Sequence, residues 1–457
     1  MAESKPNIVF MLLDNLGFGD PGCYGGGVLR MAPTPRVDGL ADEGLRLTNF
    51  NVEHACTPTR AALMTGRLPI RSGCERVRFG VKNGLAPWEY TMARMLKDVG
   101  YSTAIYGKWH LGNVAERHPT ALGFDEWYGI QDSTDPVFDL MQADKGALVR
   151  QTKIWEGKAG SPAVPVADYD PESRPFIDAE TTDRACQYIH DRAATGQPFF
   201  LYIPFTMIHH PALPHPEFKG RSGNGPYADC MLEVDSYTGR VLDALNEAGV
   251  QDDTIVVWAS DNGPPSHGTL GPQGDTGPFR GCLGTAYEGQ LRVPCIIRWP
   301  GHVEARTVSN DMVSVTDFYA TFARICGGRV PTDRAMDSMD LTGFLEGKEP
   351  SPRDWLLAFV GDSLAAIKWR QYKLHLIEYG TQPGHRYKLD LAFPQLYNVA
   401  SDPKEEWDIY GANLWVNEAI QRIVFDYRKS VEEFPHVPVG GDGPSDAPRP
   451  KKLLARE

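Results

Sequence analysis

The chain has 457 residues, of which 42% are hydrophobic and 23% are charged, proportions that are ordinary for a globular enzyme. This length suits one large α/β domain together with a smaller one. The formal net charge of −13 argues against a nucleic-acid partner, because binding to phosphates requires a basic surface. A small anionic substrate is compatible with it, since a local pocket can be positive on a negative protein.

Short apolar runs alternate with helix-like segments over the first 350 residues. The runs predict buried strands at 7–14, 102–108, 199–205, 254–262 and 294–300. The periodicity between them predicts helices at 91–100, 179–196 and 227–249. Strands that alternate with helices indicate an α/β fold in which both faces of a mostly parallel central sheet are covered.

The pattern changes near residue 350, after several prolines. Two-residue connections join three short runs, which predicts an antiparallel meander at 356–360, 363–369 and 372–377. A final helix is expected around 415–434, and the Gly- and Pro-rich tail from 439 onward is expected to be disordered. We therefore predict a catalytic α/β domain at 1–350 and a C-terminal α+β subdomain at 351–457.

The cysteines and the apolar runs bear on the compartment. Eight cysteines are scattered without a CxxC pair, which predicts reduced thiols rather than a disulfide framework. The opening MAESKP runs directly into 7-NIVFMLLD-14, which is too short and too quickly acidic for a signal peptide. No apolar run approaches the ~20 residues of a transmembrane helix. We expect a cytoplasmic protein without a membrane partner, and the oligomeric state stays open, a homo-oligomer included.

Two polar pairs follow predicted strands, Asp14-Asn15 after the first and Asp261-Asn262 at the end of the fourth. In an open parallel sheet, ligands bind beyond the carboxyl ends of the strands. One carboxylate and one amide oxygen from each pair suit a hard cation such as Ca²⁺ or Mg²⁺ rather than zinc. The alternative is that Asp and Asn simply end strands as turn residues.

Further polar residues follow two other predicted strands. In 107-GKWHLG-112, Lys108 and His110 are two residues apart, so in an extended segment both would face the same way. A cation and an imidazole on one face suit an anionic substrate that requires proton transfer. The segment 209-HHPALPH-215 places histidines after the third predicted strand. Chance surface positions and ordinary loop histidines are the alternatives.

The segment 54-HACTPTRAALMTGR-67 places Cys56 where a helix should begin. The first turn of a helix leaves backbone N–H groups unsatisfied and attracts negative charge. The cysteine is therefore either a small apolar residue, or a nucleophile or the precursor of one.

The chain resembles the type I sulfatases in a series of blocks in the same order. These are PNIVFMLLDNLGFGD, CTPTR followed by TGR, GKWHLG, PFFLYIPF with its histidine, SDNG, GTAYEGQLRVP and LYNVASDPKEE. The resemblance implies an alkaline-phosphatase-like α/β/α sandwich and hydrolysis of a small-molecule sulfate ester. It also implies that a formylglycine-generating enzyme, which reads Cys56, Pro58 and Arg60, oxidises Cys56 to formylglycine. One hydroxyl of the hydrated aldehyde would attack sulfur, and the second would later help to expel sulfate.

The resemblance also implies roles for individual residues. Metal ligands would be Asp14, Asn15, Asp261 and Asn262, with residue 56 completing the shell of one divalent cation, for which Ca²⁺ is the expected ion. Arg60 would hold the hydrate, and Lys108 and His209 would bind the sulfate or the leaving oxygen. His110 would assist breakdown of the intermediate. His209 is preferred over His210 because it stands two residues before Pro211.

Two positions depart from the family pattern. Asn15 stands where the family usually has Asp, and Leu283 stands where it usually has Lys. One alternative function is hydrolysis of phosphonate monoesters or phosphate diesters, which the same superfamily performs with the same aldehyde. Another is a catalytically inactive, anion-binding relative. The alcohol half of the substrate is not predicted, because loops such as 131–146 contain no recognisable motif.

Overall fold

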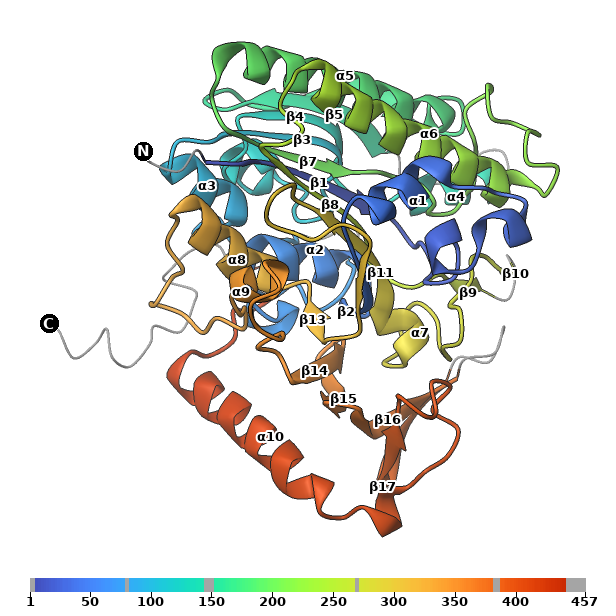
Figure 1. The fold of residues 1–457 in the computed structure, drawn as a ribbon, viewed down its shortest axis with the longest axis vertical. Helices are drawn as coiled ribbons and strands as arrows, with labels where there is room; N and C mark the ends of the chain where they lie inside the picture. Colours follow the sequence, from blue (N-terminus) through green and yellow to red (C-terminus); the bar gives the residue numbers. More distant parts are fainter. Residues whose placement is uncertain (1–4, 79–81, 144–151, 268–270, 381–386, 441–457) are drawn as a thin grey trace, which may run out of the picture.

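The computed structural model describes residues 5–78, 82–143, 152–267, 271–380 and 387–440 (Figure 1). One large sheet has the strand order β12-β2-β11-β8-β1-β7-β3-β4-β5-β6, and β13 also pairs with β2. In chain order it contains β1 (Asn7–Leu13), β2 (Leu45–Asn51), β3 (Ser102–Lys108), β4 (Glu126–Ile130), β5 (Thr152–Lys158), β6 (Val164–Tyr169), β7 (Phe199–Pro204), β8 (Thr254–Ser260), β11 (Arg292–Arg298), β12 (Thr307–Ser309) and β13 (Val313–Ser314).

The middle of this sheet is parallel, as predicted. β1 lies between β7 and β8, β3 pairs with β7 and β4, and all these pairs are parallel. The strand predicted at 294–300 is β11, and it runs antiparallel to both β8 and β2. β5 and β6 extend the other edge as an antiparallel pair. A separate two-stranded sheet joins β9 (Ser266–His267) and β10 (Gly271–Pro272).

Helices cover both faces of the large sheet (Figure 1). The described helices are α1 (Pro35–Asp42), α2 (Cys56–Thr65), α3 (Met92–Asp98), α4 (Asp135–Gln142), α5 (Ile177–Thr195), α6 (Pro226–Glu247), α7 (Glu288–Leu291), α8 (Asp317–Cys326), α9 (Thr342–Leu345) and α10 (Val416–Glu433). The predicted helices at 91–100, 179–196 and 227–249 correspond to α3, α5 and α6.

β1 shows why two layers of helices are needed. Ile8, Phe10 and Leu12 join the core that contains α2, α3 and α8, whereas alternate residues of β1 join the core that contains α1, α5 and α6. Side chains alternate between the two faces of a strand, so a strand that is apolar at every position must be covered on both faces. The α/β sandwich predicted from the sequence is therefore confirmed.

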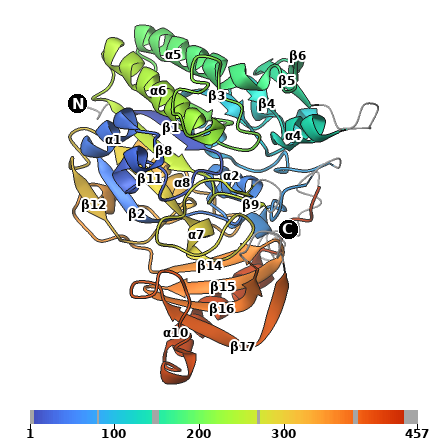
Figure 2. The same ribbon diagram turned by 90° about the vertical axis from the view of Figure 1, so that its right-hand side faces the viewer.

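The C-terminal part forms its own four-stranded antiparallel sheet with the order β14-β15-β16-β17 (Figure 2). The strands are β14 (Trp355–Val360), β15 (Ser363–Trp369), β16 (Tyr372–Tyr379) and β17 (Lys388–Asn398). The predicted meander is confirmed, a fourth strand is added to it, and α10 packs against it at the predicted place. The prediction for the tail concerns residues that lie almost entirely outside the described part.

The cysteines and the helices bear on two further predictions, that of reduced thiols and that of a chain without a transmembrane helix. All eight cysteines are free thiols. In the part of the chain that the structure describes, no helix is both long enough and apolar enough to span a bilayer.

Candidate active site

The candidate site lies at the carboxyl ends of adjacent strands in the middle of the large sheet. β1 and β8 run parallel with Leu13 opposite Ser260, so Asp14 and Asp261 leave the sheet side by side. The Asp261 amide donates to the Leu13 carbonyl over 2.9 Å. The Asn15 amide donates to Asp261 Oδ1 over 3.1 Å. The two strand ends predicted to converge do so, and their side chains are buried.

The donor set of these residues fits a hard cation. Asp14 Oδ1 and Asn262 Oδ1 are buried and find no hydrogen-bond partner among the described residues. Such orphaned oxygens are costly unless something binds them. Asn15 Oδ1 accepts from Asn262 Nδ2 over 2.5 Å, so the side-chain amides of these two residues lie side by side. Carboxylate and amide oxygens are the ligands that Ca²⁺ and Mg²⁺ prefer.

Cys56 is the first residue of α2, as predicted, and it faces the same cluster. The Cys56 thiol and one oxygen each of Asp14 and Asp261 all lie within 4.8 Å of one another. Cys56 is only 4% exposed, and Ala55 before it provides no side-chain cap for the helix. Burial raises the pKa of the Cys56 thiol to about 12, and the two carboxylates act in the same direction. The thiol is therefore neutral in these surroundings.

Two buried cations hold the carboxylates in place. Lys108 Nζ donates to Asp14 Oδ2 over 2.5 Å. The Arg60 guanidinium donates to Asp261 Oδ2 over 2.8 and 3.1 Å and to the Lys108 carbonyl over 2.7 Å. Burial alone would lower the pKa of Lys108, but Asp14 and its neighbours raise it above its ordinary value. Both side chains are therefore charged, and the cluster is a network rather than a single pair.

His110 lies in the cluster, but the reason given from the sequence was wrong. β3 ends at Lys108, and His110 has a φ of 57°, so the segment is not extended as expected. The left-handed backbone brings the His110 carbonyl to Thr57 in α2, which donates to it over 3.2 Å. Burial, and then the charges of Lys108 and Arg60, hold the pKa of His110 well below its ordinary range.

His209 follows β7 and lies against the start of the loop 131–146, in which the sequence showed no recognisable motif. Its Nδ1 lies 2.7 Å from the His210 carbonyl oxygen and 2.5 Å from Thr134 Oγ1, and its Nε2 lies 3.4 Å from Ser133 Oγ. Ser133, Thr134 and Asp135 come after β4, a strand that was not predicted. The polar residues that follow 126–130 are the feature of the sequence from which this part of the site could have been predicted.

Leu283 belongs to a segment that contacts the start of α2. The Gly284 amide donates to the His54 carbonyl over 3.1 Å, two residues before Cys56, and the Leu283 amide donates to the Pro264 carbonyl over 3.0 Å. The segment therefore lies near the cluster, which is where the comparison of Leu283 with the family's lysine assumes that it lies.

Glu288, farther along this segment, joins it to the C-terminal sheet. Glu288 accepts from Lys368 on β15 over 2.7 Å and from Lys373 on β16 over 3.0 Å. The Glu288 amide donates to Glu405 over 2.7 Å. All four of these side chains are buried. A closed network of charges thus fastens the segment that carries Leu283 to the second sheet.

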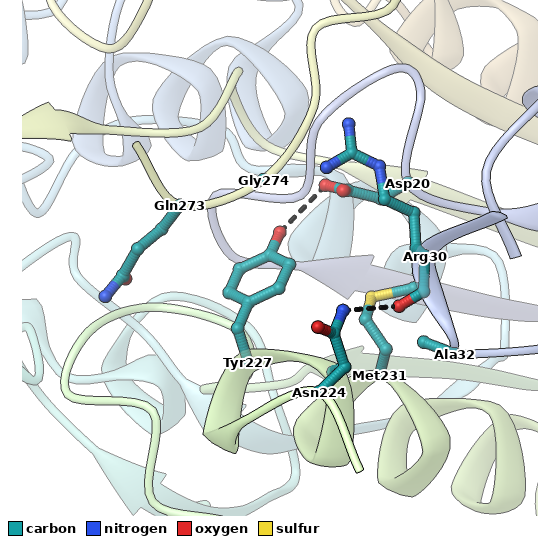
Figure 3. Close-up of a pocket in the computed structure, with 9 residues that line it drawn as sticks. Asp20, Arg30, Ala32, Asn224, Tyr227, Met231, Gln273 and Gly274 are labelled. Atoms are coloured by element: carbon teal, nitrogen blue, oxygen red, sulfur yellow. Dashed lines mark hydrogen bonds between the residues drawn. The ribbon is translucent and has the colours of Figure 1, made fainter. Parts of the chain in front are cut away.

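A cavity of about 400 Å³ lies apart from this cluster, between the N-terminus of α6 and the loop after β1 (Figure 3). Asp20 faces it, and its Oδ2 accepts from Tyr227 Oη and from the Gly17 amide, both over 2.8 Å. Arg30 is paired with Asp275. Burial raises the pKa of Asp20 to about 7. None of the residues of the strand-end cluster lines this cavity.

Comparison with known proteins identifies the family. Residues 6–328 match the family model described as Sulfatase, and residues 284–432 match the model of the C-terminal part of N-sulphoglucosamine sulphohydrolase. The chain is 35% identical to steryl-sulfatase from Mus musculus in an alignment 438 positions long that covers 80% of this chain and 69% of that protein. It is 33% identical to arylsulfatase A from Homo sapiens over 89% of this chain and 83% of that protein.

A solved structure agrees with these relatives. The crystal structure of PsFucS1 sulfatase from Pseudoalteromonas sp. matches with a TM-score of 0.88 and 32% identity, covering 95% of this chain and 92% of that one. The Sulfatase model alone spans more than half of the chain. The chain therefore belongs to the sulfatase family, and it is a type I sulfatase of the alkaline phosphatase superfamily, an enzyme that hydrolyses sulfate esters.

Proposed function

We propose that the enzyme cleaves sulfate monoesters with a formylglycine hydrate derived from Cys56, next to one divalent cation, for which Ca²⁺ is the expected ion. The observation that carries this proposal is the convergence of residue 56 with the carboxylates of Asp14 and Asp261, whose ligand atoms lie within 4.8 Å. A nucleophile placed beside a cation at a helix start suits attack on an anionic ester.

Asp14, Asn15, Asp261 and Asn262 would hold the cation, and the oxygen of the modified residue 56 would complete the shell. The orphaned oxygens of Asp14 and Asn262 support this assignment. When bound, the cation supplies Lewis-acid polarisation of the nucleophile and the sulfate oxygens. The oxygen-only donor set favours Ca²⁺ over zinc.

Cys56 acts as a precursor in this proposal. The sequence Cys56-Thr57-Pro58-Thr59-Arg60 matches the motif that the formylglycine-generating enzyme reads in this family, which makes that enzyme a partner during maturation. The hydrated aldehyde would supply one hydroxyl as the nucleophile and a second hydroxyl for the release of sulfate.

The side chains around residue 56 have distinct roles in the proposed reaction. Arg60 orients the hydrate, and it is itself held by two bonds to Asp261. Lys108 places a positive charge beside the sulfate oxygens. His209 gives a proton to the leaving oxygen, and His110 takes a proton when sulfate is released. The negative charge of the ester is thus met by fixed cations, and the alcohol leaves neutral.

Peptide mass spectrometry and metal analysis test this proposal together. Protein made with a competent modifying enzyme should carry formylglycine at residue 56 and about one Ca²⁺ per chain. Cys56→Ala should remove turnover of 4-nitrophenyl sulfate but leave the circular dichroism spectrum unchanged, because alanine is small enough for the same helix start. Full activity of Cys56→Ala, zinc in place of calcium, or two metals per chain would each contradict the mechanism.

The substrate panel should also separate the alternatives. Matched sulfate and phosphonate esters compare sulfatase activity with phosphonate monoester hydrolysis, and higher kcat/KM on sulfates is expected. Unmodified Cys56 with no metal in protein matured in the same way would instead indicate an inactive, anion-binding relative. Relatives include a steryl-sulfatase and an arylsulfatase, so the panel needs steroid, aryl and sugar sulfates to identify the alcohol half.

A further inference from the structure

Asp135, the first residue of α4, lies against the two histidines that follow β7. Its Oδ1 is 3.0 Å from His210 Nε2 and 3.9 Å from His209 Nε2. The rings of His209 and His210 are stacked with their centroids 4.2 Å apart. The Asp135 side chain is 33% exposed, whereas both histidines are almost fully buried. A carboxylate thus faces the histidine pair from the solvent side.

The hydrogen bonds of His209 determine which of its nitrogens exchanges a proton. Nδ1 lies 2.7 Å from the His210 carbonyl oxygen, which can only accept, so Nδ1 carries a hydrogen. Thr134 donates its hydroxyl hydrogen to the same carbonyl over 2.7 Å. Nε2 is therefore the nitrogen that gains or gives a proton, and it lies 3.4 Å from Ser133 Oγ and 3.9 Å from Asp135 Oδ1.

Two carboxylates and three basic side chains face His209. Asp14 at the end of β1 and Asp135 are negative, whereas Lys108 and His110 at the end of β3 and the neighbouring His210 are basic. The charge of Asp14 is already met by Lys108 over 2.5 Å. Asp135 is thus the carboxylate whose charge is available to a protonated His209.

The surroundings of His209 shift its pKa in opposite directions. Burial, followed by His210, lowers the pKa of His209 to about 3, while Asp135 and Asp14 act in the opposite direction. The pKa of Asp135 is held well below its ordinary value, because the two histidines outweigh the effect of burial. An imidazolium at this position needs an ionised carboxylate beside it.

We propose that Asp135 is a positioning residue whose charge, 3.9 Å from His209 Nε2, stabilises the protonated form of His209, so that the enzyme cleaves sulfate esters of poorly acidic alcohols. This inference rests on the proposed function of His209. In the step, the bond between sulfur and the leaving oxygen breaks as sulfur bonds to the attacking hydroxyl oxygen. The proton of that hydroxyl passes to the carboxylate of Asp261, one oxygen of which lies within 4.8 Å of the side-chain ligand atom of residue 56. The electron pair of the broken bond goes to the leaving oxygen, which takes the proton from Nε2. His209 ends neutral, and Asp135 stays ionised.

A leaving-group series distinguishes this role from a structural one. Wild type, Asp135→Asn, Asp135→Glu and Asp139→Asn, all matured to the same extent at residue 56, would be assayed on 4-nitrophenyl, phenyl and 4-methoxyphenyl sulfate. Asp139 is exposed one helical turn farther along α4, so Asp139→Asn is the matched control. 4-Nitrophenolate leaves readily without a proton, whereas the other two phenolates depend on protonation.

Asp135→Asn should lower kcat/KM on phenyl and 4-methoxyphenyl sulfate about 10²-fold but on 4-nitrophenyl sulfate less than about threefold. Asp135→Glu should recover part of the loss, and Asp139→Asn should behave as wild type. Equal losses on all three esters, or no loss on any, would overturn the role of Asp135 but leave the proposed function intact. Failure of fully matured wild type to hydrolyse any of the esters would overturn both.

Discussion

Glu288 offers a sharp test of how the two sheets are held together. Its carboxylate accepts from Lys368, Lys373 and Arg292 over 2.7, 3.0 and 3.4 Å, and all four side chains are buried. Glu288→Gln removes the negative charge and leaves these cations in place. Because uncompensated buried charge is costly, we expect the free energy of unfolding to fall by ~3–5 kcal/mol at pH 7.

The share of Lys368 in this loss can be estimated. Burial lowers the pKa of Lys368 to about 8, below the 10.5 of an exposed lysine. At pH 7 the ammonium is therefore mostly intact in wild type, and losing it in the variant accounts for ~1.4 kcal/mol of the expected deficit. Above pH 8 the lysine gives up its proton in wild type as well. The deficit of the variant should thus shrink by about 1 kcal/mol between pH 7 and pH 9.

Urea unfolding followed by tryptophan fluorescence at pH 7 and pH 9 measures both quantities. Glu418→Gln is the control, because Glu418 pairs with Arg422 on α10 but is 76% exposed, and it should change stability by less than ~0.5 kcal/mol. Adding Lys368→Met to Glu288→Gln should restore part of the loss, since the lysine is then no longer unpaired. A deficit as small as that of the control, or one that grows toward pH 9, would refute the reasoning.

Three further predictions concern the site and the separate cavity that Asp20 faces. Asp261→Ala should abolish bound calcium in elemental analysis together with turnover, because it removes one of two carboxylates, and retention of the metal would contradict the assigned ligands. Asn15→Asp and Leu283→Lys should each lower kcat/KM, because each changes the charge of the site by one unit. The double variant should show a favourable coupling of ~0.5–3 kcal/mol, and strictly additive effects on kcat/KM would contradict the placement of Leu283 near the cluster. Burial raises the pKa of Asp20 to about 7, so Asp20 holds its proton more tightly in the folded state than in the unfolded state. The stability of wild type should therefore fall by ~1–4 kcal/mol relative to that of Asp20→Asn between pH 4 and pH 7. Parallel pH profiles of the two proteins in thermal unfolding would contradict this.

The central strands could be predicted because a buried parallel strand is apolar at every position. Their polar ends could be predicted because the candidate metal ligands come directly after such a strand in the sequence. β1, β7 and β8 all fit this pattern, and so does the start of α2. The direction of β11 could not be predicted, since a buried antiparallel strand has the same apolar run. β4 was missed because Glu126 and Gly129 interrupt its pattern, and β17 because much of it is exposed.

Parts of the site could not be predicted because they depend on contacts between distant parts of the chain. Asp135 follows a strand that was not predicted, and its contact with His210 joins residues 75 positions apart in the chain. Pairing β3 with both β4 and β7 creates this contact, and no local pattern encodes it. The segment after Lys108 is not extended as expected, because the backbone of His110 turns into the left-handed region.

The burial of Cys56 has a consequence for the order of events during synthesis. At 4% exposure, the thiol cannot enter the active site of another protein once α2 is packed between the sheet and α8. β1 gains its partner β8 only when Ser260 has been made, 204 residues after Cys56. At ~5–20 residues per second, that delay lasts ~10–40 s. The sheet order thus gives a modifying enzyme a period in which Cys56 is still accessible, and the length of the chain between Cys56 and the end of β8 sets its duration.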